Sequence, residues 1–183
     1  MAKDLIIDDL EDSINKKIYS QDYSTKPIIE GVQLVELKNY TGDEGDFTEV
    51  MKFVNGHLEN IPDFSVTQIN RTLLFEGSVK AWHLHLKQDE IWYVAPMFHL
   101  FVGLWDIRKN SKTCNQTMRV NLGGSDSHYL YIPRGVAHGS ANFSNEDVNL
   151  FYLVNQTFNR ENPDELRISW DALGAEFWSP QRD

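Results

Sequence analysis

Short apolar segments separated by turn-forming residues run through most of this chain. These segments are residues 64–70, 78–86, 90–95, 98–106, 117–122, 128–132 and 148–154. Their Val, Ile, Tyr, Phe and Trp residues favour strands, and the Gly, Asn and Ser residues between them favour tight turns. Strands at such short intervals are typical of an antiparallel sandwich or small barrel. We therefore predict an all-β fold, an antiparallel barrel or jelly roll with only short peripheral helices.

The N-terminal segment differs from this pattern. Residues 1–26 are acidic and polar, with a few scattered apolar side chains. These are Leu5, Ile6, Leu10, Ile14 and Ile18, which fit either one face of a helix or a mobile arm. We expect an N-terminal arm over residues 1–26 and a barrel domain with a C-terminal tail over residues 27–183.

Shorter elements are expected at both ends of the barrel domain. Residues 28–37 indicate a strand, residues 41–45 a turn, and residues 46–53 a second strand or a short helix. The tail, which contains Pro163 and Trp178, is expected to form one or two short helices or turns packed on the outside.

Composition excludes several classes of function. The 183 residues are 41% hydrophobic and suit one domain with a sizeable core. The formal charge of −10 disfavours nucleic acid, whose binding depends on Lys and Arg, so an anionic substrate needs a local basic pocket. Cys114 is the single cysteine and cannot form an internal disulfide. No apolar run approaches about 18 residues and no signal-peptide pattern is present, so we expect a soluble cytoplasmic protein without membrane contact.

Two of the six histidines share one predicted strand, and a third follows a turn that leads into another. Alternate side chains of a strand share a face, so His83 and His85 point one way and Trp82 points the other. His138 follows a Pro-x-Gly turn and arrives from a second strand. Together with Glu90 these imidazoles can converge inside a barrel. Such a cluster predicts a functional site, which either binds a metal or transfers protons.

One pair of motifs resembles the metal-binding cupins. Their patterns are His-x-His-(x)3–4-Glu and Pro-x-Gly-x-x-His-(x)3-Asn, and the matching residues here are His83, His85, Glu90, His138 and Asn142. Three imidazoles and a carboxylate suit one divalent transition metal, Fe, Mn, Zn or Ni, with positions left open for substrate. On this alternative reading the protein is a metal-dependent cupin, either an enzyme or a small-molecule sensor, with His83, His85, Glu90 and His138 as ligands.

A longer resemblance, over residues 31–178, is to the dTDP-4-dehydrorhamnose 3,5-epimerase family of the cupin superfamily. Its landmarks occur here in order, at residues 31–32, 45–49, 68–70, 80–83, 106–113, 132–139, 151–152, 163–165 and 170–171. Lys80-Ala81-Trp82-His83 resembles the family's Arg-Gly-Leu-His, which supplies its catalytic base. Ile132-Pro133-Arg134-Gly135-Val136-Ala137-His138-Gly139 is similar to its Ile-Pro-x-Gly-Phe-Ala-His-Gly. We identify the chain as a divergent member.

The resemblance implies epimerase or isomerase chemistry on a nucleotide-linked 4-keto-6-deoxy sugar, without a cofactor, in a homodimer. An α-proton next to a ketone is removed by a base, and an acid returns a proton on the opposite face. The resemblance implies that His83 is the base and Tyr152 the acid. Lys80 steadies a phosphate or the enolate oxygen. The remaining substrate-binding residues are His138, His85, Gln68 and Asn70.

The sequence departs from the family pattern at two places, and the first of them keeps a third interpretation open. Asp43 and Glu44 stand where the family has an arginine before Gly45, which is unfavourable for a diphosphate. The family's Ser-x-Lys-Asp segment, whose aspartate orients the catalytic histidine, has no clear counterpart. A non-catalytic sugar-binding cupin therefore remains the third alternative.

Overall fold

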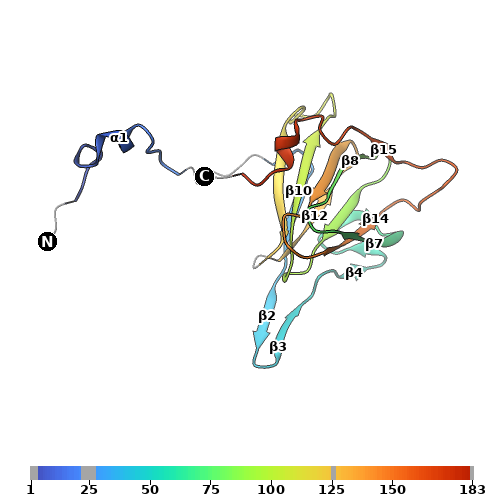
Figure 1. The fold of residues 1–183 in the computed structure, drawn as a ribbon. Helices are drawn as coiled ribbons and strands as arrows, with labels where there is room; N and C mark the ends of the chain where they lie inside the picture. Colours follow the sequence, from blue (N-terminus) through green and yellow to red (C-terminus); the bar gives the residue numbers. More distant parts are fainter. Residues whose placement is uncertain (1–3, 22–27, 125–126, 182–183) are drawn as a thin grey trace.

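Two five-stranded antiparallel sheets face each other in the computed structural model, which describes residues 4–21, 28–124 and 127–181 (Figure 1). The first sheet has the order β1 (Gln33–Glu36), β12 (His128–Ile132), β9 (Glu90–Tyr93), β14 (Val148–Val154) and β7 (Gln68–Leu74). The second has the order β11 (Thr117–Gly123), β10 (His99–Asp106), β13 (Val136–Ala141), β8 (Val79–Leu84) and β15 (Leu166–Arg167). The all-β jelly-roll prediction is confirmed.

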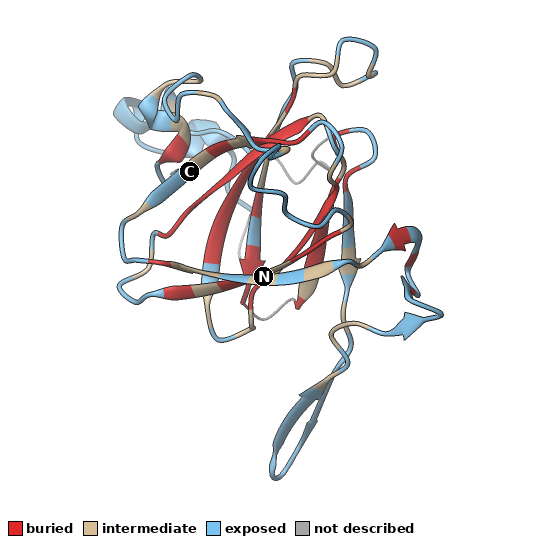
Figure 2. Ribbon diagram, turned by 90° about the vertical axis from the view of Figure 1, so that its right-hand side faces the viewer, coloured by how far each residue is buried: buried red, intermediate tan, exposed pale blue. Residues whose placement is uncertain are grey.

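The main core lies between the sheets, where buried strands enclose the centre of the molecule (Figure 2). Strand β10 is buried on both of its faces, however, and does not show the alternation of a half-exposed strand. Leu100, Val102 and Leu104 belong to the inner core, whereas Phe101 and Trp105 belong to a second cluster on the outer face. The second sheet is therefore covered on its outer face as well.

The C-terminal tail provides this outer cover, as predicted from the sequence. Its short 3₁₀ helix η2 (Ala175–Trp178) places Phe177 and Trp178 against the sheet. A Cβ atom at Gly103 would lie 2.5 Å from the Phe177 ring, so the sheet has a glycine where the tail makes its closest approach. The Trp178 Nε1–H donates to the carbonyl oxygen of Trp170 at 2.7 Å.

Strand β8 contains an irregularity that the sequence pattern did not predict. His83 pairs with His138, but the next pair is Lys80 with Ser140, so β8 carries one extra residue there. Lys80 and His83, three residues apart, consequently line the same pocket. Ala81 and Trp82 both pack in the outer cluster, where Trp82 is fully buried. The expected opposition of His83 and Trp82 is observed.

Several short elements differ from expectation. The region expected to hold a strand or short helix at 46–53 contains the end of the hairpin β2 (Asn39–Gly42)–β3 (Gly45–Thr48) and the first residue of β4 (Phe53–Val54). Strands β5 (His57–Leu58) and β6 (Ile61–Ser65) complete a small sheet with β4. The sequence did not indicate β15 at all, because two residues are too few to show a period.

The N-terminal segment forms two short helical turns, η1 (Ile7–Asp9) and α1 (Asp12–Asn15), instead of one longer helix. Its apolar side chains Leu5, Ile6, Leu10, Ile14 and Ile18 are exposed. They therefore do not make a buried helical face. Part of the expected arm, residues 1–3 and 22–26, lies outside the described residues. Over the part of the chain that is described, no helix has the length and apolar character needed to span a membrane.

The packing of the tail leads to a stability prediction. Trp178→Ala should lower the free energy of unfolding by about 3–5 kcal/mol, because Trp178 is buried against Trp82 and Phe101. The matched control is Trp170→Ala, since that side chain is 46% exposed and should cost much less. Urea unfolding of both variants measures the difference. Equal losses would show that the tail is not anchored through Trp178.

Candidate active site

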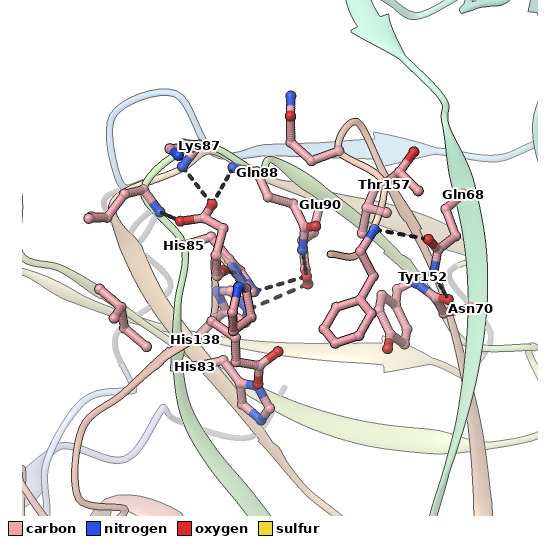
Figure 3. Close-up of a pocket in the computed structure, with 18 of the residues that line it drawn as sticks. Gln68, Asn70, His83, His85, Lys87, Gln88, Glu90, His138, Tyr152 and Thr157 are labelled. Carbon is pink, nitrogen blue, oxygen red and sulfur yellow. Dashed lines mark hydrogen bonds and ion pairs between the residues drawn. The ribbon is translucent and has the colours of Figure 1, made fainter. Parts of the chain in front are cut away.

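A pocket of about 860 Å³ opens between the two sheets and is closed on one side by the segment after β14 (Figure 3). The structure brings all of the sequence-predicted site residues to its wall, namely Gln68, Asn70, Lys80, His83, His85, Glu90, His138 and Tyr152. The volume is within the range of small-molecule sites. The roles of these residues remain predictions, but their convergence is now a structural fact.

His83 is held from both sides of its ring by the C-terminal segment. Its Nδ1 lies 2.9 Å from Glu165 Oε1, and its Nε2 lies 2.7 Å from Arg167 Nη1. A guanidinium can only donate, so Nε2 accepts from Arg167 and Nδ1 carries the proton that Glu165 accepts. Burial, together with the positive charges of His138 and Arg167, lowers the pKa of His83 to about 4. The imidazole is therefore neutral at physiological pH.

Glu90 is a buried carboxylate that hydrogen bonds satisfy on both oxygens. Oε1 lies 3.1 Å from His85 Nε2 and accepts from Gln88 Nε2 at 2.8 Å, while Oε2 lies 3.4 Å from His138 Nε2 and accepts from Trp92 Nε1. Burial alone would raise the pKa of Glu90, but the hydrogen bonds from His138 and His85 outweigh it and hold the pKa well below its usual range. Glu90 is therefore ionised in the folded protein.

The two histidines beside Glu90 each have acceptors at both ring nitrogens. His85 Nδ1 faces the carbonyl oxygen of Asp164, and His138 Nδ1 lies 3.0 Å from that of Val136. Burial opposes protonation of His85, but the hydrogen bond and charge of Glu90 prevail and raise its pKa. This cluster of His85, Glu90 and His138 lies directly against His83, whose ring stacks on that of His138 with 5.9 Å between the ring centroids.

Tyr152 stands on the opposite sheet from His83. It lies on β14, where it pairs with Trp92 and Asn70, and its side chain projects into the pocket (Figure 3). Burial, with the negative charges of Glu90 and Glu165, raises the pKa of its phenol. Tyr152 therefore keeps its proton at neutral pH and can act as a donor.

The substrate-binding residues predicted from sequence form hydrogen bonds along the pocket wall. Gln68 donates to Asn70 at 2.6 Å and accepts from the backbone N–H of Phe158 at 3.2 Å. Lys80 Nζ donates to Thr72 Oγ1 at 3.1 Å and is exposed. These groups offer amide, hydroxyl and ammonium partners to a polar ligand.

Three of the four residues predicted to bind a metal in a metal-dependent cupin lie close together in the structure. Ligand atoms of His85, Glu90 and His138 lie within 4.8 Å of one another, and His83 is not a member of this group. Each of these two histidines directs Nε2 toward Glu90 and binds a backbone carbonyl through Nδ1, an arrangement that commonly orients imidazole ligands. These three residues therefore fit a divalent cation.

Residues 164–167 contribute to the site although their roles were not predicted. Asp164 accepts from the backbone N–H groups of Leu86, Lys87 and Gln88 at 2.7–3.0 Å, which fixes the loop after β8. Glu165 and Arg167 hold His83. Residues 163–165 matched the family pattern, but nothing in the sequence joined them to a histidine 82 positions earlier.

The fold and the histidine-lined pocket define a cupin-type protein. The model of the dTDP-4-dehydrorhamnose 3,5-epimerase family matches residues 26–182, and the chain belongs to that family of sugar-nucleotide epimerases. A spore coat polysaccharide biosynthesis protein, SpsL of Bacillus subtilis, is 33% identical over 144 residues, which are 79% of this chain and 91% of the relative.

Solved structures agree with this placement. A dTDP-4-dehydrorhamnose 3,5-epimerase from Sulfolobus tokodaii is 27% identical, with a TM-score of 0.64 over 79% of this chain and 80% of that one. The 4-keto-6-deoxy sugar epimerase NovW of Streptomyces spheroides has a TM-score of 0.70 at 21% identity, over 85% of this chain and 78% of its own, and shows the shared fold.

Proposed function

We propose that this protein epimerises or isomerises a nucleotide-linked 4-keto-6-deoxy sugar at a carbon next to the ketone. The observation that carries the proposal is the placement of a neutral imidazole, His83, and a protonated phenol, Tyr152, on facing walls of one pocket. Inversion needs a base on one face of the sugar and an acid on the other. Membership of the epimerase family supports the same chemistry.

In this mechanism the Nε2 lone pair of His83 takes the α-proton, the C–H bond breaks and its electrons form an enolate. Tyr152 then gives a proton to the same carbon from the opposite face, which inverts the centre. The negative charge on the C4 oxygen needs fixed positive groups. Lys80 and His85, which is paired with Glu90, can provide them, and Gln68 and Asn70 can bind the polar edge of the sugar or nucleotide.

The second candidate function is a metal-dependent cupin, which the His85–Glu90–His138 group favours. A cation held there would act as a Lewis acid toward a substrate oxygen. His83 lies outside that group and would keep its role in proton transfer. We favour epimerisation without a cofactor because the family match covers most of the chain.

The proposal predicts the effect of two substitutions. His83→Asn should reduce solvent deuterium incorporation at C3 and C5 of a dTDP-4-keto-6-deoxyhexose by about 10²–10⁴-fold, because Asn cannot accept the proton. Tyr152→Phe should impair it as well. His57→Asn is the control, since His57 is exposed and lies outside the pocket. Absence of exchange by the wild type across a panel of nucleotide 4-keto sugars would refute the epimerase proposal.

A second prediction concerns pH. His83 acts only when neutral, and it is neutral above its pKa of about 4. The acid limb of kcat/KM should therefore fall near pH 4 and not near 6.5, the ordinary value for histidine. Because this pKa is lower in the folded state than in the unfolded chain, His83 also removes stability as pH falls from 6.5 to 4. Circular dichroism must confirm the fold at each pH, and an acid limb near 6.5 would contradict the assignment.

Metal removal separates the two candidate functions. Treatment with a chelator should leave the melting temperature and the exchange rate unchanged. A cation bound at several hundred times its dissociation constant would instead contribute roughly 3–4 kcal/mol to stability. About one equivalent of transition metal in protein purified without added metal, lost together with activity in His85→Ala, would establish the metal-dependent reading.

A further inference from the structure

The proton-accepting atom of His83 is covered by an arginine. Arg167 Nη1 lies 2.7 Å from Nε2, and the same guanidinium lies 2.7 Å from Glu165 Oε1 through Nη2. Because Nδ1 already carries a proton toward Glu165, the Nε2 lone pair is the one place on this ring where an α-proton can go. His83 cannot act as a base until Arg167 moves.

Arg167 is placed so that it can move. It is the last residue of β15, a two-residue strand at the edge of the second sheet, and its side chain is 52% exposed. Its guanidinium contacts the two side chains named above and is not part of the apolar clusters. Displacement of the guanidinium would therefore leave the core intact.

The charge of the pocket indicates what would displace it. Among the described residues that line the pocket, three carry Lys or Arg side chains: Lys80, Lys87 and Arg167. A diphosphate bound in this pocket would have to be neutralised by one or more of these three side chains. Arginine is the residue best suited to a phosphate, because its planar fork donates two parallel hydrogen bonds.

We propose that Arg167 covers the base in the free protein and is drawn off by the diphosphate of the substrate, so that His83 is uncovered only when a diphosphate-linked sugar is bound. Glu165 is a positioning residue that keeps the proton on Nδ1 throughout. The consequence of this covering would be selection of diphosphate-linked over neutral 4-keto sugars. That consequence rests on the proposed function. The covering itself is a property of the free protein.

The first test measures the reactivity of Nε2 without turnover. Diethyl pyrocarbonate acylates an imidazole nitrogen with a free lone pair, and peptide mass mapping assigns the label to His83. Labelling in Arg167→Gln should be about tenfold faster than in the wild type, the factor expected for loss of one charge-assisted hydrogen bond. Arg160→Gln, at an exposed position outside the pocket, should match the wild type.

Inorganic pyrophosphate then tests the displacement. It carries the anionic group but no sugar ring, so the space beside His83 stays open. It should accelerate labelling of His83 in the wild type and have no effect in Arg167→Gln. Equal labelling of the wild type and Arg167→Gln, or a wild type that pyrophosphate does not accelerate, would overturn the proposal.

The second test compares two substrates. The ratio of kcat/KM for the dTDP-linked 4-keto sugar to that for its methyl glycoside should fall at least about tenfold in Arg167→Gln. A variant whose active site is only damaged should lose kcat/KM by the same factor for both substrates, so that their ratio is unchanged. An unchanged ratio would overturn the proposal. If the wild type exchanges no protons in any substrate, the proposed function fails, while the labelling experiments still decide whether Arg167 covers His83.

Discussion

The buried charge of Glu90 links the two sheets at the base of the pocket. Glu90 lies on β9 of the first sheet, whereas His138 lies on β13 and His85 follows β8, both in the second sheet. A buried carboxylate is costly unless it is paired and hydrogen-bonded, and here four donors meet that requirement. The orientation of the two imidazoles and part of the electrostatic field at His83 depend on this arrangement.

The same arrangement divides the histidines by their hydrogen-bond partners. His85 and His138 each have an acceptor beside both ring nitrogens, which fixes the orientation of their rings. His83 differs because its ring nitrogens contact one acceptor and one donor. It is neutral, with a single lone pair. The pocket therefore holds two kinds of imidazole that differ in their hydrogen-bond partners, and the His83 and His138 rings are stacked on one another.

The histidines of the site could be predicted from the sequence, whereas the residues that hold His83 in place could not. The period of a strand placed His83 and His85 on one face, and the Pro-x-Gly turn placed His138 on a neighbouring strand, because these are local rules. The extra residue in β8, which turns Lys80 into the pocket, depends on pairing with β13 and leaves no local signal. Glu165 and Arg167 reach His83 from 82 and 84 residues away, on a strand too short to show a pattern.

The two glycines under the C-terminal tail limit which substitutions the second sheet can accept. Gly103 leaves room for Phe177 and Trp178, and Gly139 leaves room for Trp178 and Ala81, since a Cβ atom at either glycine would lie within 3 Å of these side chains. The tail seated there also carries Glu165 and Arg167 to His83. A relative with a side chain at either glycine could not seat this tail, and it would need another partner for its histidine. Packing on the outer face of the sheet and the surroundings of His83 are thus coupled through one segment of the chain.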